Sequence, residues 1–291
     1  MILLAGATGV LGGAIASRLV YEGQPVRLLA RDAARVKELA ASGAQVTQGD
    51  LTDRASLERA MGGVTHVITT ANGFMNRSRR AVEKIDVQGN RHLIDAAKAA
   101  RVRQFVFTSA LLPDPYLQID YFAAKRRTED YLRASGVPYT ILRPAAFMET
   151  WALVIGEPIL KRGATQIFGN GRNPINFVAV DDVAAIAVQA LDRPDAINSV
   201  VEIPGPENLT QLQVAALFER IRGTSARKRH LPVPLMRVMA SVLRPVNPVF
   251  ARQVAAGALM ATVPQARDPL EARAKWSAPM TRMEDWARGK Y

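Results

Sequence analysis

The glycine-rich segment Gly6-Ala7-Thr8-Gly9-Val10-Leu11-Gly12 follows a short apolar run, residues 2–5, and leads into a helical pattern, residues 12–22. Glycines at these spacings permit a tight turn, a close approach of backbone to a pyrophosphate, and close packing of helix on strand. The N-terminus of the following helix presents amide groups and a positive dipole end to phosphates. The order strand, turn, helix, strand therefore favours a dinucleotide-binding turn over a plain strand-to-helix connection.

The first half of the chain alternates short apolar runs with helix-length segments. Strands are predicted at residues 2–5, 26–30, 45–48, 64–70, 105–109 and 139–142, and helices at residues such as 12–22 and 79–100. Strands that alternate with helices indicate a parallel sheet covered on both faces, with right-handed crossovers.

The pattern changes after Pro144. Short strands are expected at 166–168, 175–178 and 200–203. Helices are expected at 181–191, 235–243 and 249–260, and another opens at Thr210 with a capping box to Gln213. We predict an α/β doubly wound parallel sheet (Rossmann) with a smaller, mainly helical C-terminal lobe. Residues 1–150 form the NADP-binding domain, with a return to the sheet at 181–203, and residues 151–180 and 204–291 form the substrate-binding lobe.

The end of the second strand distinguishes between two cofactors. An acidic residue there binds the ribose 2′-hydroxyl of NAD, whereas this chain has Arg31 followed by Asp32. A guanidinium at that place suits a 2′-phosphate, and Arg35 one turn later supports the same group. NADP(H) is therefore the expected cofactor; a shift of one residue would instead make Asp32 the ribose ligand.

The composition of the chain excludes several kinds of site and partner. The chain has no cysteine, which excludes thiol chemistry and cysteine-based metal sites, and no metal site is expected from His66, His92 and His230. Neither a signal peptide nor a membrane-spanning run is recognisable, so a cytoplasmic location is expected. The net charge of +12 is concentrated between Arg220 and Arg267, where nine Lys or Arg residues and no Asp or Glu occur. This stretch suits an acidic substrate, an anionic membrane surface or simply solvent; nucleic acid is not expected because exposed aromatics are not interleaved with it.

The sequence resembles the atypical short-chain dehydrogenase/reductases, and within them the NmrA-like NAD(P)H-binding family. The resemblance rests on the glycine turn, Arg31-Asp32 and several segments along almost the whole chain, namely residues 49–53, 86–90, 105–109, 141–144 and 180–184. It implies that Asp50 and Leu51 flank the adenine. It further implies cofactor contacts from Gly6, Thr8, Gly9, Val10, Leu11, Gly12, Thr70, Ala71, Asn72, Lys125, Pro144 and Phe147.

Tyr121 and Lys125 are spaced i, i+4 and so share one face of a helix. A lysine ammonium beside a phenol is expected to lower the phenol pKa, and a poised phenol can protonate a carbonyl oxygen as hydride arrives. The resemblance also gives Lys125 a contact with the nicotinamide ribose. The family's catalytic hydroxyl aligns either with Ala110, which leaves the set incomplete, or with Ser109 if the alignment shifts by one residue.

The predicted function is an NADPH-dependent oxidoreductase that transfers hydride to an apolar or aromatic carbonyl or quinone-like small molecule. Tyr121 is the expected acid, Lys125 its electrostatic partner and Ser109 a hydrogen-bond donor. The alternative is a non-catalytic NADP(H)-sensing regulatory or scaffold protein, which Ala110 and the basic stretch favour. A nucleotide-sugar epimerase is a weaker alternative, because the C-terminal lobe is too apolar for a sugar nucleotide.

Overall fold

The computed structural model describes residues 1–78, 80–111, 113–268 and 275–291. These residues form two compact units. The first contains Met1–Ala110, Asp120–Arg143 and Val183–Glu202, and the second contains Leu111–Ile119, Pro144–Asp182 and Ile203–Tyr291.

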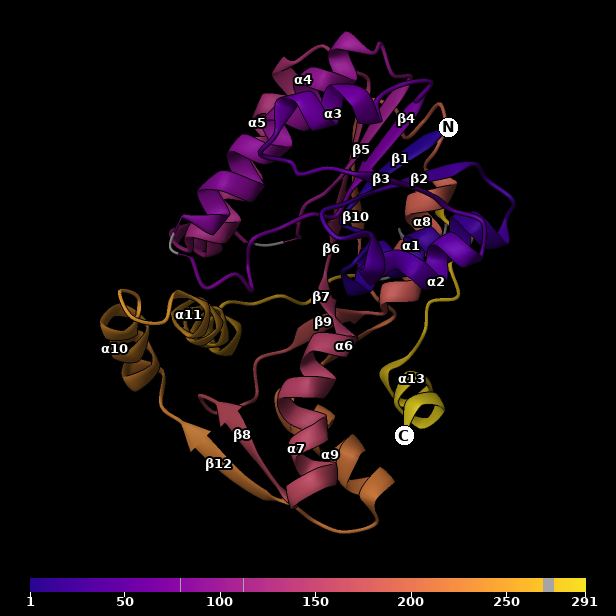
Figure 1. Ribbon diagram of the computed structural model, residues 1–291. Coiled ribbons are helices and arrows are strands. Elements are labelled where there is room, and N and C mark those ends of the chain that lie inside the picture. Colours follow the sequence, from indigo (N-terminus) through magenta and orange to yellow (C-terminus); the bar gives the residue numbers. More distant parts are fainter. Residues whose placement is uncertain (79, 112, 269–274) are drawn as a thin grey trace. The chain divides into compact units, whose positions relative to one another are not determined.

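The first unit is built on a sheet of seven strands in the described part of the chain, in the order β10-β6-β5-β4-β1-β2-β3 (Figure 1). Neighbouring strands from β6 through β3 pair in parallel. The strands are β1 (Ile2–Ala5), β2 (Val26–Ala30), β3 (Gln45–Gln48), β4 (His66–Thr69), β5 (Gln104–Thr108), β6 (Tyr139–Pro144) and β10 (Ser199–Ile203). The central strands β1, β4 and β5 are buried along their whole length, as their apolar composition predicts.

Helices cover both faces of this sheet, as Figure 1 shows: α3, α4 and α5 lie on one face and α1, α2 and α8 on the other. Their bounds are α1 (Val10–Tyr21), α2 (Lys37–Ala41), α3 (Arg54–Ala60), α4 (Asn90–Ala99), α5 (Asp120–Ala134) and α8 (Val180–Gln189). A 3₁₀ turn, η1 (Ala33–Val36), precedes α2, and a π-helix, η2 (Val82–Gly89), precedes α4. Leu3, Val67, Phe105 and Leu93 belong to the core between the sheet and one helical layer. The doubly wound parallel sheet expected from the sequence is confirmed.

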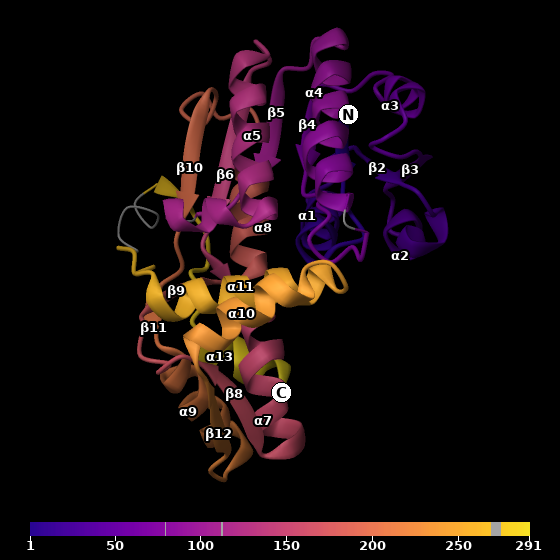
Figure 2. The ribbon, with the colours of Figure 1, turned by 90° about the vertical axis from the view of Figure 1, so that its left-hand side faces the viewer.

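The second unit combines two small sheets with short helices (Figure 2). One sheet has the order β11-β9-β7, and the other pairs β12 with β8 in parallel. The strands are β7 (Ala146–Phe147), β8 (Ala164–Phe168), β9 (Ile175–Val178), β11 (Glu207–Leu209) and β12 (Arg227–Leu231). The helices are η3 (Asp114–Gln118), α6 (Met148–Trp151), η4 (Ala152–Gly156), α7 (Glu157–Arg162), α9 (Gln211–Arg222), α10 (Val233–Leu243), α11 (Pro248–Thr262) and α13 (Met283–Lys290).

The capping box predicted at the start of α9 is present: Thr210 Oγ1 accepts from the Gln213 amide, and Gln213 Oε1 accepts from the Thr210 amide. The strand β12 was not predicted, because its sequence Arg-Lys-Arg-His-Leu lacks the apolar alternation of a half-buried strand. Within the residues described, no helix has the combination of length and apolar character that crossing a membrane requires.

Candidate functional site

The turn after β1 can be built only from glycine at two of its three glycine positions. Gly6 has φ +100°, a conformation that side chains disfavour, and an added Cβ would lie 2.5 Å from Thr70 Oγ1. A Cβ on Gly12 would lie 2.1 Å from the carbonyl oxygen of Gly6. These contacts hold α1 against the ends of β1 and β4, so the first amides of α1 come to the carboxyl edge of the sheet.

Gly9 differs from its two neighbours in the motif. A Cβ there would meet only Gly6 O, at 3.4 Å, within 4 Å, so the protein itself leaves the space above Gly9 open. Gly9 is the N-cap of α1 and offers no side-chain acceptor to the first-turn amides. Thr8 and Val10 are exposed and Leu11 is partly exposed, with Val10 at 71% although it is apolar. An open backbone, free helix amides and an uncovered valine together suit a bound pyrophosphate.

The structure assigns different tasks to Arg31 and Asp32. The Asp32 carboxylate accepts a hydrogen bond from the Ala34 amide at 3.0 Å and caps η1. The side chain of Arg31 is exposed at the end of β2, and within the described ranges it forms no ion pair. Arg35 is exposed on the same short turn. Because Asp32 is committed to the cap, the arrangement favours Arg31 as the ligand of a 2′-phosphate.

Two loops complete the edge around the glycine turn. Asp50 Oδ1 accepts from the amide and the hydroxyl of Thr52, which fixes the loop after β3, and Leu51 is buried against Gly89. Thr70 Oγ1 donates to Gly6 O at 3.3 Å.

The loop after β4 is also held from within. Ala71 is partly buried and its amide donates to Thr69 Oγ1, while the exposed Asn72 donates to Thr70 O and accepts from the Phe74 amide. The loops after β3 and β4, which are expected to contact the cofactor, therefore belong to the same unit as the glycine turn.

Lys125 is buried on the inner face of α5. Its Nζ donates to Thr108 O at 2.9 Å and lies 3.8 Å from Asp86 Oδ1, with only 4% of the residue exposed. Burial lowers the pKa of Lys125, while the carboxylates of Asp86 and Glu129 oppose that shift. The lysine is thus fixed at the end of β5 by a carbonyl oxygen and a buried acid.

Tyr121 lies one turn before Lys125, half-buried between aromatic rings. The ring centroids of Phe74 and Phe122 each lie 4.9 Å from the ring centroid of Tyr121, and both rings meet Tyr121 edge-on. The ammonium of Lys125 lies 5.6 Å from the Tyr121 ring centroid. Burial, and secondly the charge of Asp86, raise the pKa of Tyr121 above its ordinary value. The expectation of a lowered phenol pKa is therefore wrong, because burial and the charge of Asp86 both act to raise it.

Ser109 is directed into an ion-pair cluster. Its Oγ donates to Glu129 Oε1 at 2.5 Å, and Glu129 also accepts from Arg143 and Arg133. Burial works to raise the pKa of Glu129, but Arg143, Ser109 and Arg133 together hold it below its usual value. The Ser109 hydroxyl is thus committed to a carboxylate, contrary to the expectation that it serves a substrate, and Ala110 follows it without a hydroxyl.

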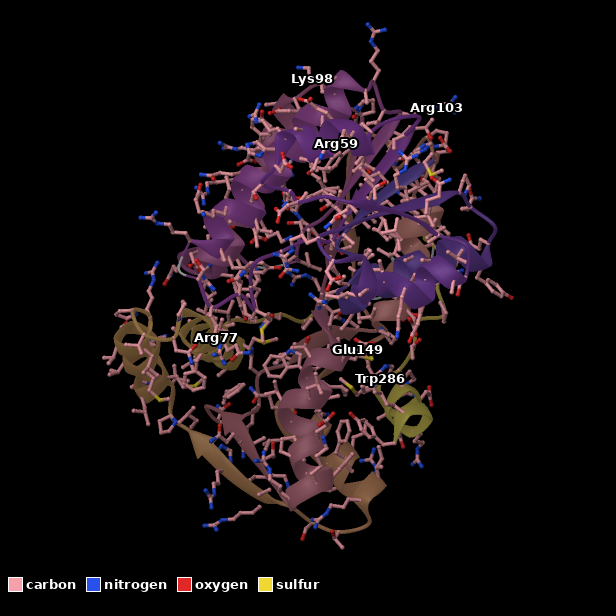
Figure 3. All side chains as sticks on the ribbon, in the orientation of Figure 1. Arg59, Arg77, Lys98, Arg103, Glu149 and Trp286 are labelled. Atoms are coloured by element: carbon pink, nitrogen blue, oxygen red, sulfur yellow. The ribbon has the colours of Figure 1, made fainter. Side chains whose placement is uncertain are left out.

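Pro144 and Phe147 belong to the second unit. Pro144 is buried and its carbonyl accepts from the Leu111 amide, while Phe147 is partly exposed on β7, paired with Val178 of β9. In the same unit, Figure 3 labels Glu149, whose Oε1 accepts from the Val180 amide. Burial raises the pKa of the Glu149 carboxyl.

Sequence reasoning gave no role to Asp86, which the structure places at the centre of the site. Asp86 is fully buried in η2, and its Oδ2 accepts from the Gly73 amide at 2.8 Å while Oδ1 faces Lys125. It therefore links the loop after β4 to the lysine. The available signal was its spacing of four residues from Val82 and from Asn90, which places an acid on the buried stripe of a helix.

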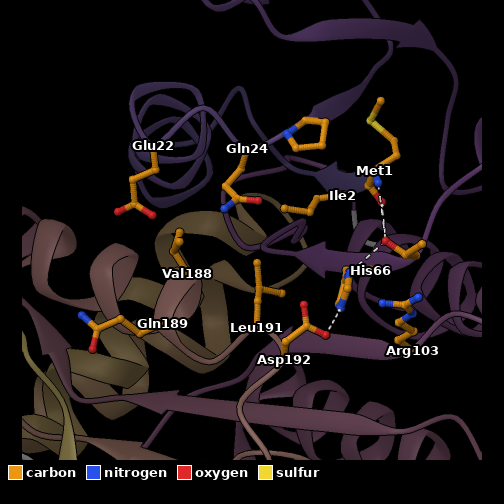
Figure 4. A pocket seen from close by; sticks show the side chains of 12 residues that line it. Met1, Ile2, Glu22, Gln24, His66, Arg103, Val188, Gln189, Leu191 and Asp192 are labelled. Atoms are coloured by element: carbon orange, nitrogen blue, oxygen red, sulfur yellow. Dashed lines mark hydrogen bonds and ion pairs between the residues drawn. The ribbon is translucent and has the colours of Figure 1, made fainter.

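The three histidines have different partners and do not gather at one site. His66 is buried, with its nitrogens at 2.9 Å from Thr65 Oγ1 and from Asp192 Oδ1, and it lines a cavity of about 330 Å³ at the amino ends of β1 and β4 (Figure 4). That cavity is at the opposite edge of the sheet from the glycine turn. His92 contacts Leu51 O and His230 contacts Gly169 O. Among the residues that the structure describes, no cluster of three or more His, Asp or Glu has the arrangement of a metal site.

The profile of the NmrA-like family matches residues 1–272, and the chain belongs to this family. Similar curated relatives include the NAD(P)H azoreductase of Xenophilus azovorans, 31% identical, over 78% of this chain and 76% of that protein. The photosystem II assembly factor Ycf39 of Cyanophora paradoxa is 30% identical, over 81% and 73%. The (4-alkanoyl-5-oxo-2,5-dihydrofuran-3-yl)methyl phosphate reductase of Streptomyces griseus is 33% identical, over 96% and 97%.

Solved structures share the fold at lower identity. The NADPH complex of the Escherichia coli quinone oxidoreductase QOR2 is 24% identical, with a TM-score of 0.78 over 99% of each chain. The NADP(H) complex of the Citrobacter sp. triphenylmethane reductase is 20% identical, with a TM-score of 0.79 over 100% of this chain and 99% of that one. At this identity the likeness supports the fold alone.

Proposed function

We propose that this protein is an NADPH-dependent reductase of aromatic, quinone-like acceptors. The observation that carries the proposal is the buried Lys125, fixed by Thr108 O and Asp86 one helical turn from a neutral Tyr121. A lysine is rarely buried for packing alone, because desolvation of its charge is costly unless that charge has a purpose and a partner.

The residues of the first unit fit NADPH. The first amides of α1 and the open backbone at Gly9 would donate hydrogen bonds to the pyrophosphate, and Arg31 would bind the 2′-phosphate. Leu51 and Asp50 border the adenine, while Thr70, Ala71 and Asn72 border the remainder of the dinucleotide. Lys125 holds the ribose hydroxyls through the part of its ammonium that Thr108 O does not occupy.

When bound, NADPH supplies a hydride. The side chains around the site suit an acceptor that can take this hydride without first being protonated by an acidic residue. Tyr121 keeps its proton at every working pH, because its pKa is raised, and so donates a hydrogen bond to an acceptor oxygen without titrating. The reduced acceptor then takes its proton from solvent, and the serine hydroxyl is not needed.

The aromatic side chains suggest the acceptor class. Phe74, Tyr121 and Phe122 form a group of edge-on rings beside Lys125. Such rings favour a flat conjugated molecule over an aliphatic one, since offset and edge-on aromatic contacts stabilise it beyond simple burial. A quinone is such a molecule, and it accepts a hydride without prior protonation. The name of the azoreductase relative is consistent with a conjugated acceptor.

Replacement of Tyr121 tests the chemistry. NADPH oxidation by a panel of quinones, aromatic aldehydes and ketones is followed for the wild type, Tyr121→Phe and Lys125→Met. Loss of one hydrogen bond to the acceptor predicts a fall in kcat/KM of about ten-fold for Tyr121→Phe. Lys125→Met also weakens NADPH binding. Tyr21→Phe, at a side chain that is 91% exposed, is the matched control and stays at the wild-type rate. A Tyr121→Phe variant with a rate reduced more than a thousand-fold would instead establish Tyr121 as an obligatory acid.

A second function is favoured by the commitment of Ser109 to Glu129 and by Ala110: a non-catalytic NADP(H)-binding protein that regulates or assembles a partner. The assembly-factor relative is named for such a role. This alternative predicts tight NADPH binding with no acceptor reduced, and Lys125→Met would then change cofactor affinity alone.

A further inference from the structure

The helix α10 carries an apolar stripe that the second unit does not use for packing. Leu235, Val238 and Val242 are 48%, 59% and 66% exposed. Their i, i+3, i+7 spacing places all three within an arc of about 60° on the helix. Val246, between α10 and α11, is 83% exposed, and Phe250, in the first turn of α11, is 39% exposed. We call these five residues the α10 stripe.

A different side of α10 holds the helix in the fold. Met236 is fully buried and forms a cluster with Val254 and Ala258 of α11. Gly257 allows the close approach, since a Cβ there would lie 3.0 Å from Met236 Cε. Figure 2 shows α10 and α11 side by side in the second unit. The α10 stripe is therefore not required for packing within the unit, and exposing it to water costs free energy at about 25 cal/mol for each Å² of apolar surface.

The charged side chains along α10 and the start of α11 have one sign. Arg237 and Arg244 are exposed on α10, and within the described residues neither forms an ion pair. From Arg220 to Arg267 the sequence has nine Lys or Arg residues and no acid. A symmetric dimer through this face would bring the arginines of two copies together without a carboxylate to neutralise them. An apolar stripe flanked by arginine alone instead matches helices that lie in the interface of an anionic bilayer.

We propose that α10 and the start of α11 bind reversibly to an anionic lipid surface. Val238 and Val242 insert among the acyl chains near the headgroups, and Arg237 and Arg244 contact lipid phosphates. The helix lies along the surface and does not cross it. Lipid binding by α10 does not depend on whether the protein reduces an acceptor or only binds NADP(H).

Co-sedimentation of the full chain with vesicles tests this proposal. Vesicles of phosphatidylcholine alone are compared with vesicles that also contain phosphatidylglycerol, at low and high salt. Binding is expected only with phosphatidylglycerol and is expected to weaken with salt. Arg237→Gln with Arg244→Gln lowers the affinity about 25-fold, from about five-fold for each arginine near an anionic surface. Val238→Asn with Val242→Asn lowers it about ten-fold or more.

Tyr21→Asn, which removes a still more exposed hydrophobic side chain from α1, is the matched control and binds as the wild type does. Thermal unfolding and NADPH titration of every variant verify that each is folded. Absence of binding to the anionic vesicles, or equal binding by all variants, overturns the proposal. So does sedimentation velocity that shows a wild-type dimer which Val238→Asn with Val242→Asn dissociates, together with no vesicle binding; the face then belongs to a second copy.

Discussion

Alanine at Gly9, Gly12 and Gly13 separates the requirements of the fold from those of the cofactor. The added methyl group is the same in all three variants, but its surroundings differ. At Gly12 the Cβ would be 2.1 Å from Gly6 O and 2.7 Å from Thr70 Oγ1, so the turn and α1 must move apart. At Gly13 it would meet only Ala7 O, at 3.5 Å, which is an ordinary contact, and at Gly9 only Gly6 O, at 3.4 Å.

The magnitudes follow from these distances. Gly12→Ala is overpacked against backbone and should lower the free energy of unfolding by about 3 kcal/mol or more. Gly13→Ala should raise it by up to about 1 kcal/mol, because alanine is the better helix former. Gly9→Ala should change it by less than about 1 kcal/mol, since φ −90° and ψ 165° suit alanine and only an N-cap preference is lost.

Cofactor affinity should follow a different order. Gly9→Ala fills the space that the pyrophosphate needs, so NADPH binding should fall at least about a hundred-fold although the protein stays folded. Gly13→Ala should bind NADPH as the wild type does. Thermal unfolding and NADPH fluorescence titration give the two quantities for each variant. Undiminished NADPH binding by a folded Gly9→Ala protein would refute the placement of the pyrophosphate on this turn.

Three other substitutions have distinct expected outcomes. Arg31→Ala should weaken NADPH binding by about 1.5–3 kcal/mol, roughly ten- to hundred-fold, and leave NADH binding unchanged; Asp32→Ala should lose the cap of η1 but keep the cofactor preference, and equal loss for both cofactors would argue against Arg31. Glu129→Gln should destabilise the fold by about 3 kcal/mol, because Arg143 is left without its buried carboxylate. The folded-state pKa of Glu129 is depressed, so its contribution is present above the unfolded value, near ~4.3, and is lost as pH falls through the folded value. Urea unfolding across that range should show a weaker pH dependence for the variant, and an unchanged dependence would contradict the cluster.

Most strands of the first unit could be predicted from the sequence, because each is short and is specified by a local pattern of apolar and turn residues. Short apolar runs and glycine turns mark β1, β2 and the start of α1 within one residue or two of their observed bounds. In the second unit β12 was missed, because a run of four basic or polar residues becomes a strand only through its pairing with β8. That pairing is a tertiary property that local pattern does not contain.

The proximity of Tyr121 and Lys125 could be predicted from the sequence, but the electrostatics around them could not. The i, i+4 spacing brought Tyr121 and Lys125 to one helical face, as the structure has them. Spacing does not report desolvation, and it did not reveal that Asp86 faces both groups. Nor could the sequence show that Ser109 turns toward Glu129, which lies twenty positions away along the chain.

Oxidation of NADPH by a quinone shows whether the protein is an NADPH-dependent reductase. The protein saturated with NADPH is mixed with a limiting amount of a quinone, and the loss of NADPH absorbance is followed together with the reduced product. We predict that one NADPH is consumed for each quinone reduced, at a rate that Lys125→Met lowers and Tyr21→Phe does not change. Tight binding of NADPH with no consumption across the acceptor panel would contradict it.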